Sequence, residues 1–302
     1  MTVSPNGRGG EGRLPGLRFT QPSTLVDHAI ALIQLAPQSA GTLAREVLGL
    51  THAPDAMAVR MVEAALGSDP RLRCDPLGVW DLTTPSSRET IGLGELAYAV
   101  VDVETTGGMP DRGGRIVEIA IIEVRGAAIV DEYASLVNPG VPITPWVHRL
   151  TGITNVKLRG APPFEHISDE VTRRLEGRVF VAHNVGYDWR FVGTEVRRAR
   201  QLLPTGPRLC TIHLARRVLP GLRRRGLDAV ADYYGVAIQG RHRAAGDARA
   251  TAHVLIRLLA DAERRGVSGW DELNRWLNDP AEGGRPRSAA DGATRAAAGE
   301  PC

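Results

Sequence analysis

Residues 97–107, AYAVVDVETTG, are the stretch that decides the fold. The run from 97 to 103 consists of small, β-branched and aromatic residues without Gly or Pro, which predicts a buried β-strand. Side chains alternate along a strand, so Asp102 and Glu104 point to one face, about 6.6 Å apart along the strand. Two such carboxylates repel each other and lose solvation unless a cation lies between them. The stretch therefore predicts either a cation site or a strand that ends in two solvated acids.

The composition is that of a water-soluble globular protein. The chain has 302 residues, 43% of them hydrophobic and 24% charged, which allows one good core and a smaller domain. The net charge of +3 gives no strong basic field, and three cysteines without a CxxC pair argue against a disulfide framework or a thiolate zinc site. Neither a signal peptide nor an apolar run of ~20 residues is present, so we expect a cytoplasmic protein without membrane contact.

The first third of the chain predicts a small separate domain. Residues 1–19 are rich in Gly, Pro and Arg and are expected to be disordered. Apolar periodicity then predicts three short helices followed by a hairpin at 72–82. This order resembles a winged helix, so we expect a winged-helix-like α+β domain over 20–83 and a Pro- and Ser-containing linker over 84–94. Two interpretations stay open: the domain binds nucleic acid through its third helix or hairpin, or it docks protein.

The rest of the chain predicts a mixed α/β sheet. Strand patterns at 97–103, 115–124 and 128–137 are joined by short loops, which indicates an antiparallel meander. Helices then alternate with short strands, which favours helices on both faces of the sheet. We expect this domain to cover 95–265, followed over 266–302 by a short helix and a disordered tail.

Further acids follow the first pair. Asp188 comes at the start of a helix after an apolar strand, where an acid complements the helix dipole. Asp247 lies on or beside the apolar face of a later helix and needs a partner, either an arginine or a metal. His242 precedes it by five residues and would diverge from it by about 140° on a continuous helix. Gly246 indicates instead that His242 lies on the loop before that helix.

Three motifs resemble those of the DEDDh exonuclease family. They are DVETTG at 102–107, HNxxYD at 183–188 ahead of a helix that carries Phe191, and HxAxxDA at 242–248. The resemblance extends over about 96–262. It implies a ribonuclease H-like mixed sheet with flanking helices, and an enzyme that removes nucleoside 5′-monophosphates from a 3′ end.

The resemblance also implies roles for individual residues. Two divalent ions, Mg²⁺ or Mn²⁺, are expected on four carboxylates without a lysine or arginine partner, and His242 is expected to be the general base. The four expected metal ligands are Asp102, Glu104, Asp188 and Asp247. The expected substrate-binding residues are Thr105, Thr106, Gly107, His183, Asn184 and Phe191.

The expected substrate is nucleic acid with a free 3′ end, single-stranded or frayed, and a DNA polymerase or repair complex is a partner that the family suggests. DNA is the favoured polymer, in proofreading or repair. An RNA 3′-end exonuclease remains an alternative because no motif reports a contact to the 2′-hydroxyl. A nucleic-acid-binding regulator or scaffold with an ancillary nuclease domain is a second alternative.

Overall fold

The structure is a computed structural model that describes residues 15–20, 25–33, 37–69, 71–76, 78–82 and 91–279. The expected tail at 280–302, most of the expected linker and residues 1–14 lie outside the described residues. Among the residues that are described, no helix has the length and apolar character needed to cross a membrane.

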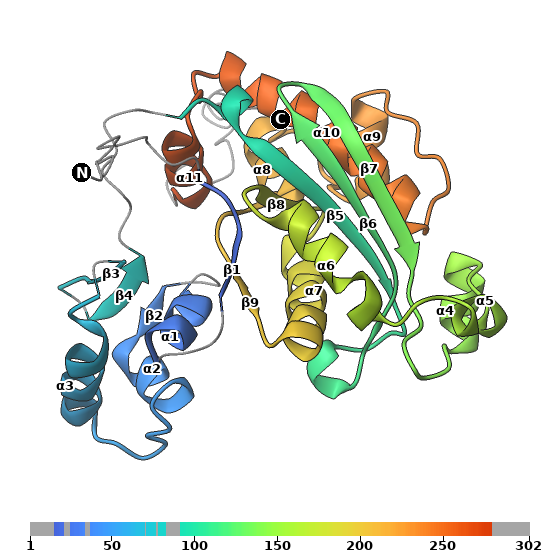
Figure 1. The fold of residues 1–302 in the computed structure, drawn as a ribbon. Helices are drawn as coiled ribbons and strands as arrows, with labels where there is room; N and C mark the ends of the chain where they lie inside the picture. The colour runs from blue at the N-terminus through green and yellow to red at the C-terminus, as the bar shows by residue number, and fades with distance from the viewer. Residues whose placement is uncertain are drawn as a thin grey trace, which may run out of the picture.

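A five-stranded mixed sheet forms the centre of the molecule (Figure 1). Strands β5 (Ala97–Thr105), β6 (Ile116–Arg125) and β7 (Ala128–Leu136) make an antiparallel meander. Strands β8 (Val179–Ala182) and β10 (Arg208–Cys210) extend it in parallel with β5, giving the order β10-β8-β5-β6-β7. This is the ribonuclease H-like sheet that the sequence predicts.

Helices cover both faces of this sheet, and the alternation along β5 assigns its side chains to two cores. Tyr98 and Val100 belong to one core, to which α8 (Thr211–Val218), α9 (Leu227–Tyr233) and α10 (Ala244–Arg264) contribute. Ala99, Val101 and Val103 belong to the other, to which α6 (Phe164–Leu175) and α7 (Val185–Arg200) contribute. Asp102 and Glu104 alternate with the second set, so they share the face of Tyr98 and Val100.

The expectation that residues 1–19 are disordered is wrong for their last part. Leu17 is fully buried in the core beneath α6 and α7, and its backbone N–H donates to the Arg178 carbonyl at 2.8 Å. The next residues form β1 (Arg18–Thr20), which pairs antiparallel with β9 (Leu203–Thr205). A segment ahead of the N-terminal helices is therefore part of the core of the main domain.

The expected linker over 84–94 extends too far along the chain, because its last four residues contact the main domain. Leu93 is 1% exposed, and its backbone N–H donates to the Ser268 carbonyl at 2.8 Å. Ile91 accepts a hydrogen bond from the N–H of Trp270, the first residue of α11 (Trp270–Asn278). Residues 91–94 thus belong to the main domain, together with the short helix that the sequence predicts.

The N-terminal segment has a core of its own, built around Leu43, Val62 and Trp80. A small sheet with the order β2-β4-β3 packs with three helices, in the chain order expected for this segment. Its winged-helix-like identity stays a prediction. The elements are α1 (Leu25–Ile33), β2 (Gln38–Ser39), α2 (Ala40–Glu46), α3 (Asp55–Leu66), β3 (Leu72–Cys74) and β4 (Val79–Leu82).

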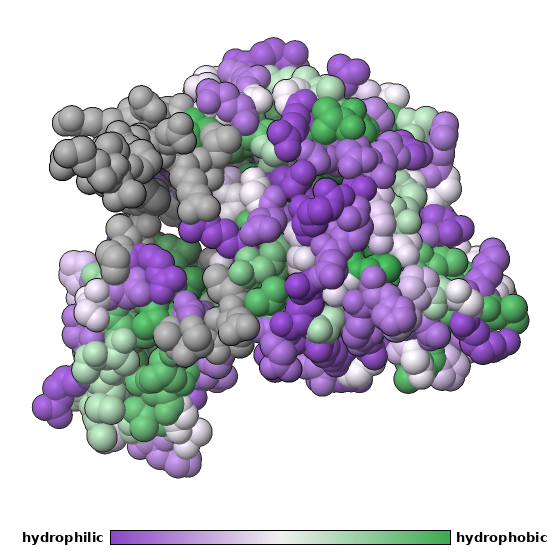
Figure 2. Space-filling view, viewed as in Figure 1, coloured by the Kyte–Doolittle hydropathy of each residue, from purple (hydrophilic) through white to green (hydrophobic). Residues whose placement is uncertain are grey.

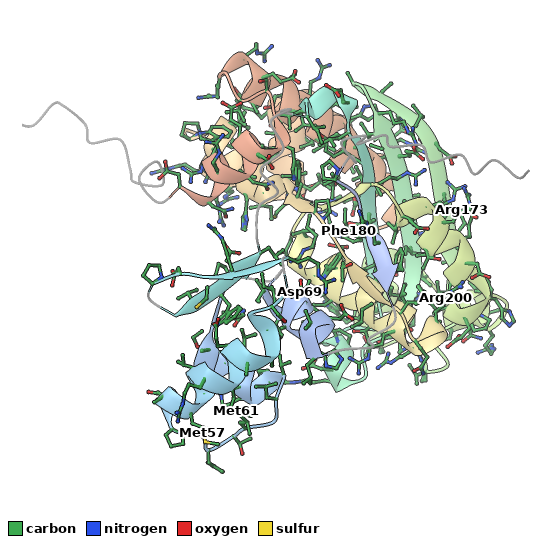
Figure 3. All side chains as sticks on the ribbon, turned by 60° about the vertical axis from the view of Figure 1, so that its left-hand side comes forward. Met57, Met61, Asp69, Arg173, Phe180 and Arg200 are labelled. Atoms are coloured by element: carbon green, nitrogen blue, oxygen red, sulfur yellow. The ribbon has the colours of Figure 1, made fainter. Side chains whose placement is uncertain are left out.

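The exposed side of α3 carries three large apolar residues among charged ones. Met57, Val59 and Met61 are 45%, 48% and 43% exposed, and Met57 and Met61 lie at the outer edge of this segment in Figure 3. The lower left of Figure 2 shows the same segment with much hydrophobic surface.

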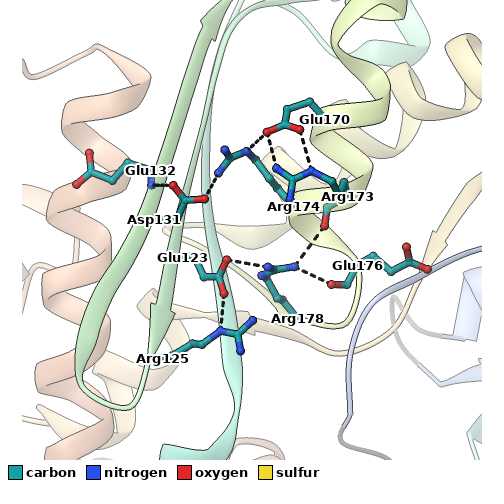
Figure 4. A network of polar contacts seen from close by, with 9 residues as sticks. All are labelled: Glu123, Arg125, Asp131, Glu132, Glu170, Arg173, Arg174, Glu176 and Arg178. Atoms are coloured by element: carbon teal, nitrogen blue, oxygen red, sulfur yellow. Dashed lines mark hydrogen bonds and ion pairs between the residues drawn. The ribbon is translucent and has the colours of Figure 1, made fainter.

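Ion pairs fasten α6 to the edge of the sheet (Figure 4). Arg174 of α6 donates to Asp131 of β7 at 2.6 Å, and its guanidinium lies 4.9 Å from the ring centroid of Tyr133. Arg178, which follows α6, donates to Glu123 of β6 at 2.7 Å. Many arginines on this side of the domain therefore have acidic partners.

Candidate active site

Three carboxylates from two elements meet at the carboxyl end of β5. Asp102 and Glu104 come from the strand, and Asp247 comes from the first turn of α10, so residues far apart in sequence share one place. Each offers an oxygen such that the three oxygens lie within 4.8 Å of one another. Carboxylate oxygens at this separation can hold a divalent cation.

The fourth acid joins this cluster from α7. Asp188 lies in the first turn of that helix and is 4% exposed. Its Oδ1 accepts a hydrogen bond from the backbone N–H of Val103 at 3.1 Å, which places it beside the strand between Asp102 and Glu104. The structure thus brings together all four acids that the sequence singles out.

Burial is the main reason why these acids resist ionisation. It raises the pKa of Asp102 well above the usual range, and the charges of Asp188, Glu104 and Asp247 raise it further. Burial likewise raises the pKa of Glu104 to about 7 and that of Asp188 to about 8. The pKa of Asp247 is also raised, mainly by burial. The cluster therefore favours a positive charge in its midst.

One carboxylate oxygen shows that a ligand fits here. Oδ1 of Asp247 is buried and has no hydrogen-bond partner among the described residues. A buried acceptor without a partner is costly, whereas a hard divalent cation binds such oxygens well. The acids present are therefore suited to a metal ion.

The expectation that the acids lack an arginine partner is wrong. Nη1 of Arg241 lies 2.5 Å from Oδ2 of Asp247, and Nε of the same side chain lies 2.8 Å from Oδ1 of Asp228 on α9. Neither Arg241 nor Asp228 belongs to the motifs used in the sequence analysis. The pair forms because the loop before α10 turns back over the start of α9.

His242 lies on the loop before α10, as the sequence predicts. Its backbone adopts φ 61°, and its N–H donates to Oδ2 of Asp247 at 3.1 Å. The loop reaches this position because Gly246 has no side chain: a Cβ there would lie 2.0 Å from the Gln239 carbonyl oxygen. The backbone of His242 is thus held next to Asp247 by a local bend of the chain, and Nδ1 of its ring lies 3.4 Å from Nη1 of Arg241.

A buried acid that the sequence analysis did not single out anchors the start of α10. Glu118 of β6, which pairs in register with Glu104, accepts from Arg243 Nη2 at 2.7 Å and from the backbone N–H of Ala244 at 3.0 Å. A signal for it exists in the sequence, because Glu118 interrupts the apolar run IVEIAII.

The turn after β5, which directly follows Asp102 and Glu104 in sequence, is braced by hydrogen bonds. Oγ1 of Thr105 lies 2.8 Å from the Tyr187 hydroxyl and accepts from the Gly107 N–H at 3.2 Å. Oγ1 of Thr106 accepts from the backbone N–H of Arg115 at 3.0 Å. Gly107 has φ 93°, which favours glycine. These three residues, expected to bind substrate, form a braced turn.

The rings of two residues expected to bind substrate have partners within the protein. Nδ1 of His183 lies 2.8 Å from Oγ1 of Thr211 and Nε2 lies 3.0 Å from the Arg225 carbonyl oxygen, so both ring nitrogens already have partners. Phe191 is 0% exposed and lies against Tyr187, with ring centroids 4.9 Å apart. The expectation of direct substrate contact is therefore wrong for Phe191, whose buried ring packs behind Tyr187, whereas substrate contact by the half-buried His183 stays a prediction. Asn184 is exposed, with φ 84°, where α7 begins.

Comparisons with known proteins identify the family to which the chain is similar. The exonuclease family (RNase_T) matches residues 99–255, slightly more than half of the chain. DNA polymerase III subunit epsilon of Aquifex aeolicus is 34% identical over 179 residues, which cover 60% of this chain and 88% of that protein. A bifunctional exonuclease/endonuclease protein of Mycobacterium tuberculosis is 38% identical over 202 residues, 63% of this chain and 30% of that protein.

The chain spans only a small part of some relatives. The 3′-5′ exonuclease DinG of Bacillus subtilis is 34% identical over 162 residues, 54% of this chain but 17% of that protein. Among solved structures, exonuclease X in complex with 5′ overhanging duplex DNA is 27% identical, with a TM-score of 0.46, over 61% of this chain and 99% of that chain. On the family match and the epsilon relative, the chain belongs to the exonuclease family.

Proposed function

We propose that this protein is a metal-dependent 3′–5′ exonuclease that hydrolyses DNA from a free 3′ end to nucleoside 5′-monophosphates, in proofreading or repair. The observation that carries the proposal is the convergence of Asp102, Glu104, Asp188 and Asp247, with one buried oxygen of Asp247 left without a partner. The names of the relatives support DNA as the polymer. We place the activity in the cytoplasm.

The four acids would hold two divalent ions, Mg²⁺ or Mn²⁺. When bound, such ions supply positive charge that activates water and stabilises the leaving oxygen of a phosphodiester. Asp102, Glu104, Asp188 and Asp247 would be the residues that hold these ions. Asp188 is held for this role by the Val103 N–H.

His242 would act as the general base and take a proton from the attacking water at a ring nitrogen. Its place on a loop rather than on α10 allows it to adjust when substrate binds. The turn of Thr105, Thr106 and Gly107 would receive the terminal nucleotide, because a glycine backbone permits close approach.

A DNA polymerase or repair complex is the proposed protein partner. The exposed methionines of α3 favour protein docking over duplex binding for the N-terminal segment. The helix also carries Asp55 and Glu63 against the single cation Arg60, which is unfavourable for phosphate contacts.

Turnover of 5′-labelled single-stranded DNA and RNA oligonucleotides, measured side by side with Mg²⁺ or Mn²⁺, tests the proposal. We expect a ladder of products shortened from the 3′ end, faster for DNA, and no products from Asp102→Ala. Asp271→Asn on α11 is the matched control and should behave as wild type. Shortening from the 5′ end would overturn the stated polarity, and faster RNA turnover would favour the RNA alternative.

A further inference from the structure

A surface beside the active site carries cations without acids. Residues 138–163 contain Arg149, Lys157 and Arg159 but neither Asp nor Glu. All three side chains are exposed, and they take part in no ion pair within the described part of the chain. This contrasts with the paired arginines of α6, where Arg173 and Arg174 share Glu170. Unpaired cations on a folded surface are available for an anionic ligand.

The same segment exposes a tryptophan. Trp146 of α4 (Pro145–Thr151) is 59% exposed, whereas Trp80, Trp189 and Trp270 are between 2% and 8% exposed. Arg149 follows Trp146 by three residues on this helix, so the two side chains are neighbours on its surface. An exposed indole beside cations is the arrangement that single-stranded nucleic acid needs, because bases stack on aromatic rings while phosphates contact cations.

The segment is held rigidly next to the substrate turn. Val147 of α4 is buried, and a Cβ built on Gly107 would lie 3.9 Å from its Cγ2, so α4 adjoins the turn after β5. Nδ1 of His148 lies 2.7 Å from the Ile153 carbonyl oxygen, which ties α4 to α5 (Asn155–Arg159). In Figure 1 the two helices lie together at the right of the sheet.

A cavity of about 440 Å³ adjoins α5. Arg159 contributes to its lining, together with Asn138 and Asn155, so cationic and amide groups face the same space. Val141, Pro142 and Leu158 also line it, so the cavity has a mixed lining in which Arg159 is the cationic group.

We infer that Trp146, Arg149, Lys157 and Arg159, here called the α4–α5 surface, bind the single-stranded nucleic acid that leads to the active site. Trp146 stacks on a base upstream of the terminal nucleotide, and the three cations contact the phosphates that flank it. This inference rests on the proposed function for the position of the 3′ end. It predicts that the surface matters for long substrates more than for the shortest ones.

Binding is tested first, without turnover. Wild-type protein in a chelator is titrated with a twelve-nucleotide oligothymidylate while tryptophan fluorescence is recorded. We expect quenching that is lost in Trp146→Phe, although this variant still binds. Trp146→Ala should weaken binding roughly 5- to 100-fold, the range for loss of one base stack. Quenching of equal size in wild type and Trp146→Phe would overturn the inference.

The phosphate contacts are tested by salt. Lys157→Gln and Arg159→Gln should each weaken binding and lower the slope of log affinity against log salt concentration by roughly 0.7 for single-stranded substrate. Arg216→Gln, an exposed arginine on α8, is the matched control and should leave the slope unchanged. An unaltered slope in both variants would show that α5 does not contact the strand.

Turnover separates this inference from the proposed function. The ratio of kcat/KM for a twelve-nucleotide substrate to that for a dinucleotide should fall roughly 10-fold in Trp146→Ala, with most of the change in KM, and recover largely in Trp146→Phe. Tyr233→Ala on α9, an aromatic residue 58% exposed, is the control. Wild type that hydrolyses neither substrate would overturn the proposed function; active enzyme with an unchanged ratio would overturn the α4–α5 surface.

Discussion

Nη1 of Arg241 lies 2.5 Å from Oδ2 of Asp247, so a guanidinium reaches into a cluster of four acids. The same side chain pairs with Asp228 on α9, which ties the loop that carries His242 to a neighbouring helix. The positive charge of Arg241 lowers the pKa of Asp102 and Glu104, although burial outweighs it in both cases. The positive charge of Arg241 therefore compensates part of the negative charge of the carboxylate cluster, and a bound metal ion would compensate the remainder.

Replacing Arg241 by glutamine should change metal binding and stability in opposite ways. Without the guanidinium, the metal-free cluster loses a nearby cation and we expect a lower melting temperature. The metal ion no longer competes with a cation for Asp247, so less Mn²⁺ should be needed to raise that temperature, by roughly 3- to 10-fold in concentration. Thermal melts at a series of Mn²⁺ concentrations measure both effects.

A matched control is Arg249→Gln, which removes a different arginine of the same region, one that pairs with Glu132 on β7. It should leave the dependence on Mn²⁺ unchanged. An Arg241→Gln protein that needs more Mn²⁺ than wild type would contradict the competition argued here.

The metal-free protein should become less stable as the pH rises. Burial raises the pKa of Glu104 to about 7 and that of Asp188 to about 8, above the values near 4 of unfolded chains. The folded state therefore binds more protons, so its stability is fully present below about pH 4 and is lost as the pH rises through 7 and 8. We expect a decline of about 1 kcal/mol per pH unit between pH 6 and 8, measured by denaturant unfolding in a chelator.

Two comparisons make this pH dependence specific to the cluster. Asp188→Asn should flatten the decline, because the amide does not titrate, and saturating Mn²⁺ should flatten it further because the ionised carboxylates gain a partner. Asp271→Asn on α11 should leave it unchanged. A metal-free protein that gains stability between pH 6 and 8 would show that these acids are ionised without difficulty.

The main sheet and the four acids of the cluster could be predicted because the local residue pattern and the topology of this part of the chain indicate the same arrangement. The apolar run up to Val103 defines β5, and the alternation along it fixes the face of Asp102 and Glu104. Arg241 could not be assigned to Asp247, because the pairing depends on how the loop bends at Gly246 under contact with Gln239. The burial of Phe191 could not be predicted either, because a motif gives the position of a residue in the sequence but not the direction in which its ring points.

Segments whose partners are distant in sequence were also missed. Residues 15–20 have the composition of a disordered terminus, and they are ordered by pairing with β9 and by the contacts of Leu17 with Arg178 and the core, all far along the chain. The expected linker ends early for the same reason, because Leu93 is fixed by Ser268. The hydrophobic periodicity of such short segments gives no information on contacts with residues that are distant in sequence.

Leu17→Ala should destabilise the main domain although the residue precedes the N-terminal helices. The side chain is 0% exposed among the residues beneath α6 and α7, so truncation leaves a cavity. We expect a loss of about 2–5 kcal/mol in the free energy of unfolding, measured with urea. Val130→Ala, at an exposed position on β7, is the control and should change it by less than about 0.5 kcal/mol.

The burial of Leu17 and the pairing of β1 also predict what happens when the N-terminal residues are removed. A fragment that begins at Gly94 lacks both Leu17 and β1, so it should melt at a lower temperature than the full chain. A fragment of equal stability would show that β1 contributes nothing to the main domain.

His242→Ala tests the assignment of the general base. A base contributes about 10²–10⁴-fold to the rate, whereas the acids assemble the site itself, so kcat should fall within that range while the Mn²⁺-induced rise in melting temperature persists. Asp247→Ala, by contrast, should lose both, because its buried oxygen is a proposed ligand. The defect of His242→Ala should also shrink as the pH rises, since hydroxide needs no base. Loss of the Mn²⁺ response in His242→Ala would make the imidazole a ligand, and an unchanged rate at neutral pH would remove His242 from the mechanism.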